Sequence, residues 1–226
     1  MLIQQLFDAY QRFFPKSLAT DSLFLEAGMV NRFAELDFGF FPLGPGLLAN
    51  EVTLKTAKIM DCRILVLGND FGTVSYIEKK CPYRREKYNN PTIKNLRLLG
   101  LNENTTLFSN LFMGLRTTGG NTDPKFVPPA YRTACLEFYR EQLKILQPRI
   151  VICLGKQVLE ALVYFDKIFQ PYTVKPISYL FQNDNSDFVI NCSGIKYLIM
   201  PHPSYAHINW SKYRVAEQVR EELSKS

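Results

Sequence analysis

The spacing of apolar residues predicts one helix at the N-terminus, followed by a series of short strands. Ile3, Phe7, Tyr10 and Phe14 recur at helical intervals, and Pro15 ends this pattern. Further along the chain, short apolar runs rich in leucine and β-branched residues stop at glycine or at polar residues, which is typical of buried strands. Strands are predicted over residues 63–67, 106–109, 149–154, 188–191 and 196–200.

Helical patterns fill the intervals between these strands, and the predicted helices cover residues 90–99, 128–146, 156–164 and 211 onward. Buried strands that alternate with helices form a mostly parallel sheet with helices on both faces. We therefore predict an α/β fold, with three αβα layers around a central, mostly parallel sheet of four to five strands. No repeat or linker divides the chain. We interpret residues 1–226 as a single domain, on which the helix and loop of residues 1–45 pack as an extension.

Composition adds several expected absences to this picture. The hydrophobic fraction of 46% and the charged fraction of 21% are those of an ordinary globular protein. No signal peptide is predicted, and no apolar run approaches the roughly 18 residues of a membrane span. The cysteines are odd in number and scattered without CxxC spacing, which argues against a disulfide framework and against a metal or iron–sulfur site. They are Cys62, Cys81, Cys135, Cys153 and Cys192.

The net charge of +6 and the isoelectric point near 9.0 favour a polyanionic partner. Lysine and arginine gain free energy when they release the counterions of phosphates. One segment concentrates these charges between aromatic residues, a pattern that suits a surface tracking a nucleic-acid backbone and stacking its bases. A solvated loop explains the same segment equally well. The residues concerned are Lys79, Lys80, Tyr83, Arg84, Arg85, Lys87 and Tyr88.

Polar groups follow three of the predicted strands, at the carboxyl ends where ligands bind in parallel sheets. Within Gly68–Gly72, Asp70 stands between glycines that let a substrate backbone approach closely. Asn110 interrupts an apolar run, and its amide has the donors and the acceptor needed to read a base edge. Within Pro201–Tyr205, two prolines fix the backbone on both sides of His202. Each group alone has an ordinary structural explanation, so it is their shared edge that favours a joint role.

In order and form, these groups match the motifs of a known family. The chain resembles the uracil-DNA glycosylase superfamily from about Gly44 to Trp210. Gly68–Gly72 corresponds to the first family motif, His202–Ser204 to the second, and Asn110 to the strand-end asparagine between them. Residues 148–162, PRIVICLGKQVLEAL, also resemble the family core before the second motif. The resemblance implies a uracil-DNA glycosylase-like fold and hydrolysis of the bond between a damaged base and its sugar.

The resemblance implies a role for each strand-end group. Asp70 would orient and activate water and stabilise the cationic sugar, and His202 would donate a hydrogen bond to the O2 atom of the leaving base. Asn110 would bind the uracil-like edge and discriminate it from cytosine. The base would first be flipped out of the duplex. The remaining expected base contacts are Gly68, Asn69, Phe71, Gly72 and a stacking aromatic, Tyr76, Tyr83 or Tyr88, of which Tyr88 is favoured.

The expected DNA-binding residues are Pro203, Ser204, Tyr205, His207, Lys79, Lys80, Arg84 and Arg85. The implied partner is DNA that contains uracil or another damaged base, and we expect neither a metal nor an organic cofactor. We expect a monomer that does not associate with membranes. The expected location is cytoplasmic and nucleoid-associated, as in bacteria, or otherwise intracellular.

The sequence departs from the family at three positions. Phe71 replaces the usual proline, and Ala206 stands where many members have a leucine that wedges into the DNA. Gly72 stands where the most selective members have a tyrosine that excludes the thymine methyl group. We hypothesise that the pocket tolerates bulkier 5-substituted or oxidised bases, which strict uracil selectivity on a panel of lesion duplexes would contradict. Tyr205, His207 and Ile208 remain open as replacements for the wedge.

Three other functions fit parts of the same pattern. A catalytically silent DNA-binding relative would keep the fold and the pocket, although a carboxylate facing a polyanion would then weaken binding. A hydrolase of free nucleosides would have little use for the charge of +6. A metal site built from Asp70, His202 and His207 would have few ligands.

Overall fold

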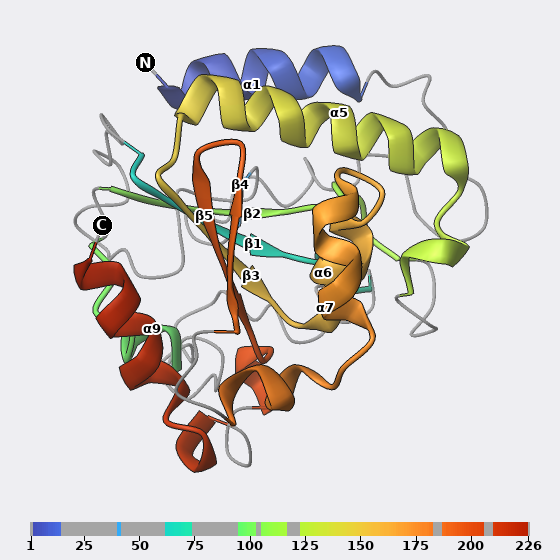
Figure 1. The fold of residues 1–226 in the computed structure, drawn as a ribbon. Coiled ribbons are helices and arrows are strands. Elements are labelled where there is room, and N and C mark those ends of the chain that lie inside the picture. The colour runs from blue at the N-terminus through green and yellow to red at the C-terminus, as the bar shows by residue number, and fades with distance from the viewer. Residues whose placement is uncertain are drawn as a thin grey trace.

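A single five-stranded sheet forms the centre of the protein (Figure 1). The computed structural model describes residues 2–14, 40–41, 62–73, 95–102, 105–116, 123–182, 187–205 and 210–225, without the side chains of Ile3 and Tyr205. The strands are β1 (Ile64–Gly68), β2 (Thr106–Asn110), β3 (Ile150–Leu154), β4 (Val189–Cys192) and β5 (Ile195–Met200). Their order is β2-β1-β3-β5-β4, and only β4 pairs antiparallel. The predicted α/β fold with a mostly parallel sheet is confirmed.

Helices pack on both faces of this sheet. The α-helices whose bounds lie within the described residues are α1 (Leu2–Phe13), α5 (Pro129–Leu146), α6 (Lys156–Leu162), α7 (Gln170–Thr173) and α9 (Val215–Ser224). Neighbouring residues of a strand point to opposite faces. In β5, the Tyr197 hydroxyl lies 3.1 Å from that of Tyr139 on α5, whereas the preceding residue, Lys196, contacts Glu222 on α9. Helices α5 and α9 therefore cover opposite faces of the sheet.

Short 3₁₀ helices complete the chain path: η2 (Pro124–Phe126), η3 (Lys167–Phe169), η4 (Ile177–Phe181) and η5 (Pro203–Tyr205). Among the described helices, none is long and apolar enough to cross a membrane. The four cysteines that the structure describes, Cys62, Cys135, Cys153 and Cys192, are buried free thiols.

Aromatic rings hold α1 against α5, and Figure 1 shows the two helices side by side. Tyr10 of α1 and Phe14, which follows the helix, are buried, and their ring centroids lie 5.8 and 5.6 Å from that of Phe138 on α5. Phe41 also lies against Tyr10, at 6.2 Å. Burying one such side chain contributes about 1.5–3 kcal/mol. Buried side chains of the N-terminal helix therefore belong to the hydrophobic core.

Several element boundaries differ from the sequence prediction. Strand β2 includes Asn110, whose Cα pairs with that of Gly68. Strand β4 runs from Val189 to Cys192, and it ends at Cys192 because the turn with positive φ at Ser193 and Gly194 follows directly. The C-terminal helix was predicted to be continuous from residue 211. Instead, a helical turn at 210–212 is separated from α9 by Arg214, whose φ of 51° is left-handed.

The predicted helix over residues 156–164 ends as α6 at Leu162 and continues as a turn. Of the predicted helix over residues 90–99, the described part is helical at 95–97 and forms a turn at 98–100. Its start at Asn90 and Pro91 lies outside the described residues.

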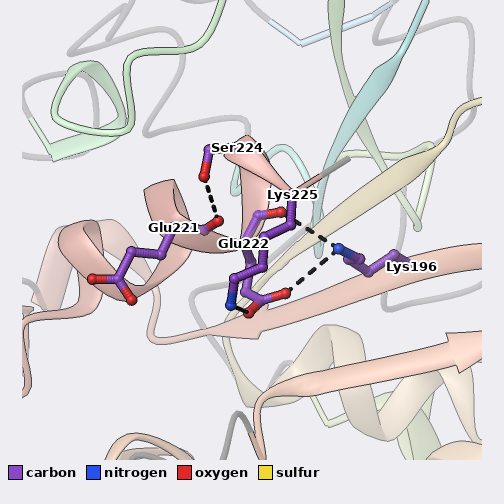
Figure 2. Close-up of polar contacts among 5 residues, drawn as sticks. All are labelled: Lys196, Glu221, Glu222, Ser224 and Lys225. Atoms are coloured by element: carbon purple, nitrogen blue, oxygen red, sulfur yellow. Dashed lines mark hydrogen bonds and ion pairs between the residues drawn. The ribbon is translucent and has the colours of Figure 1, made fainter.

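A charged cluster attaches α9 to β5 (Figure 2). The Nζ atom of Lys196 donates to the backbone oxygen of Glu222 at 3.4 Å and to its carboxylate at 3.5 Å. Lys225 donates to the other carboxylate oxygen at 2.6 Å. Because the side chains of Lys196 and Glu222 are only 22% and 10% exposed, water screens their contact weakly. The cluster therefore helps to hold the last helix on the sheet.

Candidate active site

The carboxyl ends of four neighbouring parallel strands lie along one edge of the sheet. In sheet order, Asn110 ends β2, Gly68 ends β1, Gly155 follows β3 and Pro201 follows β5. The polar groups predicted at strand ends are thus brought to one edge. The sheet order also places the end of β1 between those of β2 and β3, so the loop that carries Asp70 occupies an inner position.

The loop after β1 has a fixed backbone because it stays hydrogen-bonded to the segment after β2. Three backbone N–H groups of that segment donate to three carbonyl oxygens of the loop. The pairs are Leu111 to Gly68 at 2.9 Å, Phe112 to Asn69 at 2.8 Å, and Arg116 to Gly72 at 2.8 Å. The two segments therefore extend the β1–β2 pairing into the site.

Asp70 is held by three groups that contact its carboxylate. The backbone N–H of Gly72 donates to Oδ1 at 2.7 Å, and the Asn69 amide donates to Oδ2 at 2.9 Å. The Nε atom of Arg116 forms an ion pair with Oδ2 at 3.1 Å. The Asp70 side chain is only 5% exposed. Each carboxylate oxygen accepts at two positions, so these contacts leave Oδ1 able to accept a hydrogen bond from water.

The side chain of Asn110 lies directly over Gly68. A Cβ atom added to Gly68 would come within 2.2 Å of the Asn110 Oδ1 atom, so only glycine leaves room for the amide. Asn110 is fully buried, and neither its Oδ1 nor its Nδ2 atom has a hydrogen-bond partner in the part of the chain that the structure describes. Leaving a buried polar group unpaired costs about 1–3 kcal/mol. A ligand with complementary groups would recover this free energy.

The ring of His202 has a defined tautomer. The backbone N–H of Ser204 donates to Nδ1 at 3.2 Å, and the Ser204 hydroxyl lies 2.7 Å from the same atom. Because a backbone N–H can only donate, Nδ1 is an acceptor and the ring proton of the neutral form is on Nε2. Burial lowers the pKa of His202 below its ordinary value of 6.5, and the negative charge of nearby Asp70 opposes this shift. His202 is therefore a neutral Nε2–H donor at pH 7.

Glycine at position 155 lets the His202 loop approach β3. Its φ of +93° is a conformation that other residues rarely adopt, and an added Cβ atom would lie 3.2 Å from the Cβ atom of His202. The Gly155 N–H also donates to the backbone oxygen of Met200 at 2.8 Å.

Two buried side chains hold the His202 loop from its two ends. The Asn95 amide donates to the backbone oxygen of Pro203 at 2.9 Å. The Trp210 indole donates to the backbone oxygen of Pro201 at 3.2 Å. Because Pro201 and Pro203 flank His202, these bonds fix the position from which the imidazole projects.

The structure places some of the predicted contact residues and leaves others undescribed. Phe71 is buried, Gly72 is partly exposed with φ at +80°, and Pro203 is buried beside an exposed Ser204. The remaining candidates lie outside the described residues, apart from the backbone of Tyr205. They are Tyr76, Lys79, Lys80, Tyr83, Arg84, Arg85, Tyr88, Ala206, His207 and Ile208.

Sequence reasoning missed four side chains of this edge, namely Phe40, Asn95, Arg116 and Trp210. Phe40 stacks on Phe108 with centroids 5.6 Å apart, and its Cε2 atom would lie 3.0 Å from a Cβ atom on Gly68. Arg116 is separated from Asn110 by an apolar stretch, and Trp210 is the only tryptophan in the chain. Neither feature identifies a contact without the tertiary structure.

The acidic, histidine and cysteine side chains that the structure describes form no group of three that could hold a metal ion. His207, the third ligand of the metal site considered above, lies outside the description. The described groups can instead bind a polar planar ligand beside a carboxylate and a neutral imidazole.

Comparison with known protein families identifies the chain's relatives at family level. The sequence model of the uracil DNA glycosylase superfamily matches residues 55–224. No curated protein matches the chain. The matched range contains all five strands and the loops that carry Asp70 and His202, whereas α1 and Phe40 precede it.

Proposed function

The chain belongs to the uracil DNA glycosylase superfamily, and from this premise we propose that it hydrolyses the N-glycosidic bond of uracil or a related damaged base in DNA. Membership of the superfamily supports a glycosylase-type function and DNA as the substrate. The observation that carries the proposal is the buried Asn110 amide, which lacks a partner among the described residues and shares one edge with Asp70 and His202.

The proposed chemistry separates charge along the glycosidic bond. As this bond breaks, its electron pair leaves with the base and the sugar becomes cationic. The Asp70 carboxylate stabilises that cation, orients a water molecule and accepts its proton while the new C–O bond forms. The neutral His202 ring donates its Nε2 hydrogen bond to the base oxygen, where negative charge develops. The departing base then takes a proton from solvent. A preorganised donor such as His202 contributes a factor of about 10²–10³ to the rate.

In this proposal, Asn110 recognises the flipped base. Its amide can donate one hydrogen bond to a carbonyl oxygen and accept one from a ring N–H, the pattern of a uracil edge. Gly72 leaves space where a side chain would restrict the 5-position of the base. We therefore propose that larger 5-substituted or oxidised bases are also substrates.

The geometry disfavours the two alternative functions. A silent DNA-binding relative has no use for a buried carboxylate held by two hydrogen bonds and an ion pair, because this negative charge repels phosphates. A hydrolase of free nucleosides has no use for the net charge of +6.

A glycosylase assay on a substrate panel tests the proposal. Labelled oligonucleotides would carry uracil in a single strand, opposite guanine or opposite adenine, with 5-substituted and oxidised bases alongside. Alkaline cleavage of abasic sites measures the product. We expect cleavage of uracil and of some larger bases. Salt-sensitive binding without cleavage of any base would favour the silent relative. Release of uracil from free deoxyuridine, assayed separately, without cleavage of any oligonucleotide would favour the nucleoside hydrolase.

A further inference from the structure

We propose that Arg116 is a positioning residue that holds the Asp70 carboxylate in its working orientation. This inference rests on the proposed function, because it assigns Arg116 to the same reaction. It goes beyond the strand-end motifs, since Arg116 lies six positions after Asn110 and belongs to none of them.

The contact between the two side chains is short and shielded from water. The Arg116 Nε atom lies 3.1 Å from Asp70 Oδ2, and the side chains are 14% and 5% exposed. An exposed ion pair is typically worth little because water screens it. Here screening is weak, and removing one partner would leave an uncompensated buried charge.

The backbone fixes Arg116 relative to Asp70. The Arg116 N–H donates to the backbone oxygen of Gly72 at 2.8 Å, and the Gly72 N–H donates to Asp70 Oδ1 at 2.7 Å. The same backbone segment therefore places both charged groups. A guanidinium that reaches for DNA phosphates would instead project into solvent.

Chemistry at this edge requires a charged carboxylate in a fixed place. The carboxylate must stabilise a cation and accept the proton of water, and both actions depend on where its oxygen atoms lie. Arginine suits this purpose because it remains protonated at all working pH values. Arg116 contacts Oδ2 of Asp70, whereas Oδ1 accepts a hydrogen bond from the Gly72 N–H. Oδ1 can therefore also accept a hydrogen bond from water.

Single-turnover kinetics on a uracil duplex test the proposal through Arg116→Ala and Arg116→Lys. We expect Arg116→Ala to lower the maximal rate by about 10- to 100-fold, with the half-saturating enzyme concentration within about twofold of wild type. Arg116→Lys keeps the charge but loses the guanidinium geometry, so its rate should be intermediate. Arg140→Ala removes an arginine from an exposed pair with Glu137 on α5 and is the matched control, expected to behave as wild type.

Chemical rescue separates positioning from a general structural role. Added guanidinium ion should restore part of the rate of Arg116→Ala, whereas sodium chloride at equal ionic strength should not. A maximal rate equal to wild type in Arg116→Ala would overturn the proposal. So would a loss confined to the half-saturating concentration, which would make Arg116 a phosphate contact.

A stability measurement keeps this proposal distinct from the proposed function. Melting temperatures would be compared for wild type, Asp70→Asn, Arg116→Ala and the double variant. The decreases in melting temperature caused by Asp70→Asn and by Arg116→Ala should add up to more than the decrease in the double variant. We expect a difference of about 3 °C or more, because each single variant leaves a buried group unpaired. Additive losses would overturn the coupling whether or not the protein cleaves DNA. If Arg116→Ala does not fold, Arg116→Lys takes its place in both measurements.

Discussion

His202 is the residue whose charge state most directly limits the proposed reaction. Its backbone contact with Ser204 and its burial both favour the neutral ring with the proton on Nε2. Because its pKa lies below 6.5, the ring stays neutral as the pH falls through 6.5 and becomes protonated only at lower pH. We predict that kcat/KM for a uracil duplex is constant from pH 8 down to pH 6.5 and decreases at lower pH.

The variant His202→Asn provides the comparison for this pH profile. It should lower the rate by about 10²-fold, because a preorganised donor is lost, and it should flatten the part of the profile that His202 causes. A decline centred at or above pH 6.5 in the wild type would contradict a neutral His202, since kcat/KM reports the groups of the free enzyme.

Gly68 controls the space available to Asn110. Its replacement by alanine would put a methyl group 2.2 Å from the Asn110 Oδ1 atom, so the amide must move. We predict for Gly68→Ala a loss in kcat/KM of about 10²-fold, the effect of a displacement of about 1 Å in a site. Gly194→Ala is the control, because it has strained φ at +79° but open space around it in the β4–β5 turn. Equal activity in Gly68→Ala and wild type would exclude Asn110 from base recognition.

The main groups of the candidate site could be proposed from the sequence, but their supports could not. Asp70, Asn110 and His202 follow apolar runs, and parallel strands end at a common edge. Their roles remain predictions. The contacts that Asn95, Trp210 and Arg116 make depend on distances between segments far apart in the chain. No local pattern encodes those distances.

At the scale of elements, apolar runs in the sequence predicted the position of each strand of the sheet. They predicted the ends of those strands less accurately. A run of buried residues shows that a strand exists, whereas its last residue depends on pairing with a neighbour. Asn110 shows this well, because a polar residue within an apolar run extends β2 through its pairing with Gly68. The break at Arg214 likewise leaves no signal in an otherwise helical sequence.

The attachment of α9 to β5 depends on Glu222. Burial alone would raise the pKa of Glu222, but hydrogen bonds and charge from Lys225 and Lys196 lower it below its ordinary value of 4.5. A lowered pKa contributes stability above pH 4.5, and this contribution is lost as the pH falls through the folded-state value. We predict that Glu222→Gln reduces the free energy of unfolding by about 1–2 kcal/mol at pH 7, measured by urea unfolding.

The same helix offers a control for that prediction. Glu217→Gln removes the exposed pair with Arg214, whose side chain is 71% exposed, and should change stability by less than about 0.5 kcal/mol. The difference between wild type and Glu222→Gln should shrink below pH 4.5. A difference that is unchanged at pH 3 would show that the charge of Glu222 is not what stabilises α9.

For the whole molecule, the sequence predicted the fold class but not the strand order. Alternating buried strands and helices imply a parallel sheet, yet the order β2-β1-β3-β5-β4 follows from how the layers pack. This order places Asp70 and His202 close enough for the charge of one to act on the other. The N-terminal segment precedes the range matched by the family model but still contacts the rest of the protein. Helix α1 packs on the core, and Phe40 lies beside Gly68 at the candidate site.

The most direct test of the account compares Asp70→Asn with wild type on a duplex that contains uracil opposite guanine, with cleavage and binding measured in parallel. We predict that the wild type forms abasic sites and that the variant is slower by about 10²–10³-fold. The variant should bind the duplex as tightly or more tightly, because a negative charge near the phosphates is lost. Cleavage by Asp70→Asn at the wild-type rate would contradict the assignment of Asp70 and, with it, the proposed mechanism.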